Sequence, residues 1–239
     1  YFRLFARLSP FERRDRTIVL RPPLAGLATL QPIRGTVLLL AVMLGTVTFD
    51  GAQEGPVWRW LAPRIEEGLD FLGDEGARLL TSGLGLAACV ALLYAFYRLG
   101  ALMAGRAGRM DRPGALAGAF VHSLVPIAVA YVLAHYVSFM VLQGQGLAAL
   151  ISDPLGRGWD LFGTASAGID FTLIDSSQVW YLQVALVVVG HVAGLVSAHD
   201  RALVLFGDSR AATRSQLWML LIMVALTSFA LWLLNNANG

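Results

Sequence analysis

The chain has no lysine, one cysteine and few charged side chains, which make up 14% of its 239 residues. Without lysine, Schiff-base chemistry and retinal attachment are excluded for this sequence. Cys89 has no second cysteine with which to form an internal disulfide, so disulfide scaffolds and paired-cysteine metal sites are also excluded. Apolar residues make up 56% of the chain and its mean hydropathy is +0.63. This composition excludes an ordinary soluble domain and predicts a protein that uses lipid as its solvent.

Several familiar catalytic motifs are missing as well. The sequence has no glycine-rich phosphate loop ending in lysine, no His-Glu-x-x-His helix and no Gly-x-Ser-x-Gly turn around a nucleophile. It also has no nucleic-acid-binding motif, so we expect no nucleic-acid partner. The positive charge of the chain then has a simpler explanation in membrane topology and in contact with anionic lipid.

Five apolar stretches are long enough to cross a bilayer, for which a helix needs about 20 residues. The predicted fold class is therefore all-α, a polytopic integral membrane bundle of five transmembrane helices. The spans cover about 33–49, 77–104, 114–142, 179–198 and 216–234, preceded by a basic segment at 1–32, joined by outer loops at 50–76 and 143–178, and followed by an outer tail at 235–239.

The arginines alternate with the spans. Most of them precede the first span or lie in the second-to-third and fourth-to-fifth connections, whereas most acidic residues lie in the other two connections. By the positive-inside rule, this pattern places the N-terminus in the cytoplasm and the C-terminus outside. Because the chain starts at Tyr1 without methionine or a signal sequence, we expect it to be the later part of a longer protein.

Two outer connections carry apolar side chains. Residues 56–74 combine tryptophans with charges, which predicts a helix at the outer interface that caps the mouth of the bundle. Residues 152–177 are too apolar to extend freely into water, so we expect this loop to fold back over the bundle or dip into it.

Small residues predict where helices touch. Gly114 and Gly118 share one face of the third span, and Gly190 and Gly194 share one face of the fourth, so these two helices are expected to pack closely. Pro126 removes one backbone hydrogen bond and predicts a kink near the middle of the third span.

Histidines at membrane depth are candidate functional residues because their burial is costly. His122 on the third span and His191 on the fourth lie at matched distances from the inner ends of their helices. Such a pair could hold one metal ion, take both axial positions of haem b or act as a proton relay. The remaining alternative is that each ring hydrogen-bonds a neighbouring carbonyl or serine. His199 lies at the inner water boundary, where we expect it to be solvated.

A second polar group is predicted near the outer end. Asp50 closes the first span, and His135 and Tyr136 lie near the outer end of the third, so we take these three as candidate catalytic residues. A divalent metal, zinc or manganese, held with an open water position would supply hydrolytic chemistry. The alternative is that these groups only line the headgroup layer. The candidate metal ligands are Asp50, His135, Gln143 and Gln145.

Three stretches carry a family resemblance. Residues 46–51 read Thr-Val-Thr-Phe-Asp-Gly, residues 122–131 begin His-Ser-Leu-Val-Pro, and residues 190–194 read Gly-His-Val-Ala-Gly. Together with Ala134-His-Tyr136, Gln143-Gly-Gln145 and the run from Ala198 to Ala202, they resemble polytopic bacterial membrane proteins labelled fenitrothion hydrolase. The resemblance covers most of the chain. It implies a bacterial cytoplasmic (inner) membrane protein that hydrolyses an organophosphorus ester at a membrane-embedded site.

Three functions from different classes remain open at this stage. The first is a metal-assisted membrane hydrolase that uses Asp50 and His135, with the long outer loops as a lid. The second is a haem- or metal-binding redox subunit that uses His122 and His191. The third is a non-catalytic helical subunit whose glycine faces bind other membrane subunits or further copies of the chain.

Overall fold

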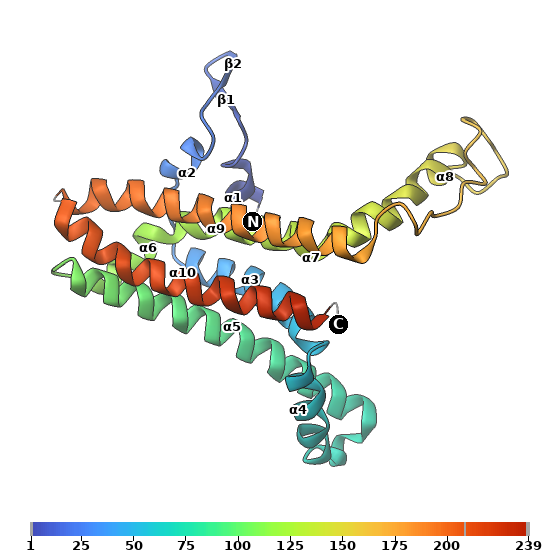
Figure 1. Ribbon diagram of the computed structural model, residues 1–239, viewed down its shortest axis with the longest axis horizontal. Helices are drawn as coiled ribbons and strands as arrows, with labels where there is room; N and C mark the ends of the chain where they lie inside the picture. Colours follow the sequence, from blue (N-terminus) through green and yellow to red (C-terminus); the bar gives the residue numbers. More distant parts are fainter. Residues whose placement is uncertain (1, 208, 238–239) are drawn as a thin grey trace.

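The protein is a polytopic helical membrane protein, as predicted. The computed structural model describes residues 2–207 and 209–237 (Figure 1). Within them, five helical segments are long and apolar enough to cross a membrane, which confirms the predicted all-α bundle. These segments are Thr36–Gln53, Asp70–Ala107, Pro113–Ser152, Ser176–Phe206 and Arg210–Phe229.

The secondary structure begins with a small N-terminal unit and continues as helices. The N-terminal unit contains α1 (Phe2–Ala6), β1 (Phe11–Arg14), β2 (Thr17–Leu20) and α2 (Ala25–Ala28). The first two spans contain α3 (Thr36–Gln53), α4 (Pro56–Glu67), η1 (Asp70–Leu72) and α5 (Gly73–Ala107). The remainder contains η2 (Pro113–Ala115), α6 (Leu116–Phe120), η3 (Val121–Ser123), α7 (Leu124–Leu142), η4 (Gln143–Gln145), α8 (Gly146–Ser152), α9 (Ser176–Phe206) and α10 (Ser209–Ala237).

Helices α7 and α9 lie side by side, and α3, α5 and α10 pack beneath them in the view of Figure 1. The connections α5–α6 and α9–α10 lie at one end of the bundle, and α4 and α8 lie at the other. Arginine-rich connections therefore share one end, called here the basic end, and acid-rich connections share the acidic end. Residues 235–237 of the predicted tail continue α10, and residues 238–239 lie outside the described part.

Proline breaks the third span near its start. Pro126 has no N–H with which to bond the carbonyl of His122, so the helix cannot continue regularly through this turn. The backbone instead forms the 3-10 turn η3 and resumes as α7 at Leu124. The Ser123 hydroxyl donates to the Phe120 carbonyl at 2.8 Å. The interruption predicted from Pro126 therefore lies between Pro126 and the basic end of the span. Toward the acidic end, α7 continues without a break to Leu142.

Close packing of α7 on α9 depends on the glycines of α9. A Cβ atom at Gly190 would collide with the Ala130 side chain, and one at Gly194 would lie 2.8 Å from the Ser123 carbonyl. The predicted contact between these two spans is confirmed. The expected role of Gly114 and Gly118 in it is wrong, because a Cβ atom at either position meets nothing within 4 Å.

The most completely buried side chains gather toward the basic end. Phe120, Leu116 and Leu40 are fully buried there, and the Tyr97 hydroxyl donates to the Ala117 carbonyl at 2.7 Å. This bond satisfies a carbonyl next to the break in the third span. Apolar side chains of the N-terminal unit, Leu4 and Leu27, belong to the same cluster.

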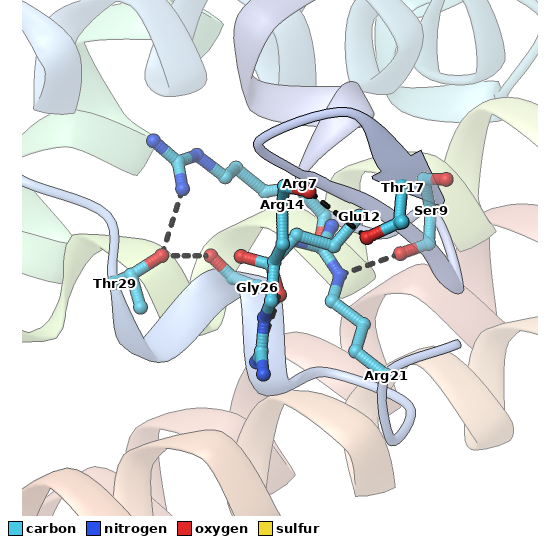
Figure 2. A network of polar contacts seen from close by, with 8 residues as sticks. All are labelled: Arg7, Ser9, Glu12, Arg14, Thr17, Arg21, Gly26 and Thr29. Carbon is cyan, nitrogen blue, oxygen red and sulfur yellow. Dashed lines mark hydrogen bonds and ion pairs between the residues drawn. The ribbon is translucent and has the colours of Figure 1, made fainter. Parts of the chain in front are cut away.

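The basic segment 1–32 is a folded unit rather than a simple tail. Arg21, which follows β2, connects the hairpin to the residues after α1. Its side chain donates to the carbonyls of Ser9 (2.7 Å) and Arg7 (2.8 Å) (Figure 2). Gly26 allows this approach, because a Cβ atom there would collide with the Arg7 carbonyl and the Arg21 guanidinium. The β1–β2 hairpin was not predicted. Its two-residue turn places Asp15 at a φ of 52°, a conformation that aspartate tolerates.

The two outer connections extend away from the bundle. Helix α4 packs beside α5, with Trp58 edge-on to Phe49 at 5.0 Å, which confirms a helix in this connection. Helix α8 and the loop 153–175 form a second projection, called here the α8 arm, that extends beyond the end of α7 and away from the bundle (Figure 1). The expectation that this loop folds back over the bundle or dips into it is therefore wrong. Several of its polar groups bond within the arm instead.

Candidate functional site

The structure brings Asp50 and His135 together. Asp50 lies near the end of α3 and His135 lies in the acidic-end half of α7, and these two helices are in contact. The Nε2 atom of His135 is 3.8 Å from an Asp50 carboxylate oxygen, with the side chains 26% and 43% exposed. This separation exceeds a direct hydrogen bond but is short enough for one water molecule to contact both groups.

Two tyrosines of α7 flank this pair. Tyr136 meets the His135 ring edge-on, with ring centroids 4.7 Å apart, and is 41% exposed. Tyr131 lies one helical turn deeper, where its hydroxyl interacts with the Thr48 side chain and lies within electrostatic range of Asp50. Tyr131 was not among the predicted site residues. Its spacing of four from His135 places both side chains on one face of α7 and could have revealed it.

The predicted glutamine ligands do not join the pair. Gln143 and Gln145 follow His135 by eight and ten residues, a rise of about 12 and 15 Å along a helix. The Gln145 side chain is already engaged, because its amide donates to the Asp170 carbonyl and accepts from the Asp170 N–H. Gln145 therefore braces the α8 arm instead of lining the site.

Asp50 and His135 alone do not make a complete protein shell for a catalytic metal. Catalytic zinc sites use three protein ligands and leave one position open. Within residues 2–207 and 209–237, no group of three or more His, Cys, Asp or Glu side chains could hold a metal ion. Among the described residues, the pair thus supplies two side-chain donors, one fewer than a catalytic zinc site uses, and the zinc or manganese site stays a prediction.

The second histidine pair is divided between two places. The His122 ring donates from Nε2 to the Ser197 carbonyl at 3.2 Å, across the contact of η3 with α9. The His191 ring donates from Nδ1 to the Val187 carbonyl of its own helix at 2.8 Å. Each ring therefore has the carbonyl partner of the alternative interpretation. The pair is not matched in depth, because Ser197 lies six residues beyond His191, or about 9 Å along α9.

Haem b also lacks a gap to occupy. Gly190, beside His191, packs directly against Ala130 of α7, so no planar macrocycle fits between the two helices at this level. His199, which we expected to be solvated, lies within 2.6 Å of the Gln216 amide oxygen on α10. Its ring thus has a protein partner at the basic end.

A cavity on the flank of the bundle is lined in part by Thr48. It has a volume of about 330 Å³, and its walls come from α3, α5 and α10. A second, smaller pocket shares Thr48, Leu93, Leu226 and Phe229 with it and is also lined by Tyr131 and His191. Sequence reasoning missed this cavity, because it depends on how three separate spans approach one another. The larger cavity is lined by Thr48, Cys89, Leu92, Leu93, Phe96, Ala225, Leu226 and Phe229.

Ser152 and Asp160 organise the α8 arm. The buried Ser152 hydroxyl donates to the Asp160 carboxylate at 2.8 Å and accepts from the Phe162 N–H at 3.1 Å. The Ala165 N–H donates to the same carboxylate oxygen at 2.9 Å. The Ala165 N–H, followed by the Ser152 hydroxyl, holds the pKa of Asp160 below its ordinary value of 3.8, because both donors favour the ionised form.

This lowered pKa predicts that acid opens the arm. The stabilisation from ionised Asp160 is fully present above pH 3.8 and is lost as the pH falls through the lower pKa of the folded state. We expect amide hydrogen exchange in residues 152–167, corrected for its intrinsic pH dependence, to accelerate in that acidic range. Asp160→Asn should show the faster exchange already at neutral pH, with exchange in α9 unchanged. Wild-type protection that is constant down to pH 2 would contradict this role of Asp160.

Comparisons with family models, curated proteins and solved structures found no match for this chain. The functional argument therefore depends on the geometry described above.

Proposed function

We propose that the protein is a membrane-embedded hydrolase of organophosphorus-type esters, and that Asp50 and His135 form its reaction centre. The observation that carries this proposal is the approach of a carboxylate and an imidazole, on two different spans, to 3.8 Å. The resemblance of the sequence to fenitrothion hydrolases gives the substrate class. Ionisable groups at membrane depth are costly, which favours a functional role for the pair.

Both side chains are partly exposed, so water and substrate can reach them. Nε2 of His135 faces Asp50, which leaves Nδ1 as the second position at which the ring exchanges a proton. A carboxylate beside an imidazole stabilises the imidazolium that forms when the ring accepts a proton. The pair thus has the parts of a general base and its supporting group.

In the proposed reaction, the oxygen of a water molecule attacks the phosphorus atom of the ester while His135 takes a proton from that water. The bond between phosphorus and the leaving aryl oxygen breaks, and the leaving oxygen takes the proton back from the imidazolium. Asp50 stays ionised and stabilises the positive ring. The reaction as proposed uses only these two side chains and water.

The test is hydrolysis of fenitrothion by the full chain in lipid nanodiscs. The rate is measured from the release of the nitrophenol product. His135→Asn is expected to lower kcat by about 10²- to 10⁴-fold, the usual contribution of a general base. Asp50→Asn is expected to lower kcat as well, with a folded chain in both cases. His199→Gln serves as a matched control, since His199 lies at the opposite end of the bundle.

Wild-type chain without activity above empty nanodiscs would reject the hydrolase. Equal activity of the wild type and His135→Asn would reject the reaction centre. The first result would favour the non-catalytic subunit over an enzyme, whereas the second would place the reaction centre elsewhere in the chain.

A further inference from the structure

The cavity between α3, α5 and α10 has the properties of a ligand site. Its volume of about 330 Å³ falls in the range of small-molecule pockets. Leu92, Phe96 and Phe229 at its mouth are 70%, 42% and 44% exposed on the flank of the bundle. In a membrane this flank contacts lipid, so a ligand would enter from the bilayer.

Two polar side chains lie next to the cavity. Tyr131 and His191 line a second, smaller pocket of about 40 Å³, which shares Thr48, Leu93, Leu226 and Phe229 with the first. His191 donates from Nδ1 to the Val187 carbonyl, so Nε2, on the other edge of the ring, is left as a hydrogen-bond acceptor. No partner for Nε2 is found among the described residues. A phenolic side chain and an imidazole acceptor therefore line one small pocket beside the apolar cavity.

This combination selects one chemistry. A ligand hydroxyl can donate to Nε2 of His191 and accept from the Tyr131 hydroxyl, so a single group would satisfy both. The rings of Phe96 and Phe229 in the larger cavity suit an aromatic body. An acyl chain would fill the apolar part but would leave Nε2 of His191 unpaired, which is costly in a site without water.

We propose that this cavity binds a lipid-soluble phenol, with its ring between α5 and α10 and its hydroxyl between Tyr131 and His191. The site does not require Asp50 and His135 to be catalytic. It lies directly below them, however, because Thr48 precedes Asp50 by two residues and Tyr131 precedes His135 by one turn.

The test uses two probes, 1-naphthol and its methyl ether, 1-methoxynaphthalene. The ether has a methyl group in place of the hydroxyl hydrogen and so cannot donate a hydrogen bond. Equilibrium dialysis of wild-type chain in nanodiscs, corrected with empty nanodiscs, is expected to show one saturable 1-naphthol site per chain. We expect the ether to bind at least about tenfold more weakly, because it cannot donate to His191. No saturable site, or equal affinity for the two probes, would overturn the proposal without any variant.

Variants then locate the site. Leu93→Trp should fill the cavity and abolish 1-naphthol binding, whereas Leu79→Trp, on the exposed surface of α5, should leave it unchanged. His191→Asn can keep a donor near the Val187 carbonyl but loses the ring acceptor, so 1-naphthol should bind it as weakly as the ether. Tight binding to Leu93→Trp would place the ligand elsewhere and overturn the assignment.

One more variant separates this site from the proposed hydrolase. Asp50→Asn should lose ester hydrolysis and retain 1-naphthol binding. A chain that binds 1-naphthol but hydrolyses nothing would therefore reject the reaction centre alone. A chain that hydrolyses fenitrothion without binding 1-naphthol would reject the phenol site alone.

Discussion

Replacing Gly190 with alanine is expected to destabilise the bundle by about 1–3 kcal/mol, because a new Cβ atom would collide with the Ala130 side chain and the helices must separate. Leucine at this position should prevent folding. Unfolding in mixed micelles with increasing dodecyl sulfate, followed by circular dichroism, measures the effect.

Two further variants make this prediction specific. Gly118→Ala should be neutral or slightly stabilising, since nothing lies within 4 Å of its added Cβ atom. Combining Gly190→Ala with Ala130→Gly should recover most of the lost stability, because the two side chains occupy the same space. Equal unfolding midpoints for Gly190→Ala and Gly118→Ala would show that the α7–α9 contact is looser than described.

Phe120→Ala is expected to have the largest effect of any truncation discussed, about 3–5 kcal/mol. Phe120 is 0% exposed in the cluster at the basic end, next to the 3-10 turn that interrupts the third span. Truncation leaves a cavity whose lining loses its dispersion contacts, a cost that persists where lipid replaces water as the solvent. The same unfolding assay measures it.

The matched control for this truncation is Phe139→Ala. Phe139 is 63% exposed on α7, so its loss should cost less than about 1 kcal/mol. Phe120→Leu should fall between the two because it leaves a smaller cavity. A similar loss for Phe120→Ala and Phe139→Ala would contradict a packed cluster at the basic end.

Hydropathy alone predicted the five spans, because each stretch must stay apolar over the thickness of a membrane. It placed their ends less well. Helix α5 runs from Gly73 to Ala107, beyond the predicted 77–104, since a helix can continue through polar residues once it leaves hydrocarbon. The N-terminal hairpin was missed for a different reason. Both strands have only four residues, β1 is mostly charged, and the turn between them contains no glycine.

The candidate site was partly predictable. Counting residues from the ends of the spans placed Asp50 and His135 at similar depth, and the structure brings them together. The same counting put Gln143 and Gln145 near them, because it assumed that the chain turns at the end of the apolar stretch. The chain instead continues through η4 into α8, which carries the glutamines away along the helix axis.

The α8 arm has a mechanical consequence. It extends the span that contains α7 beyond the bundle, while Asp50 lies on α3, which takes no part in the arm. A force on the tip of the arm would therefore act first on the helix that carries His135 and not on the helix that carries Asp50.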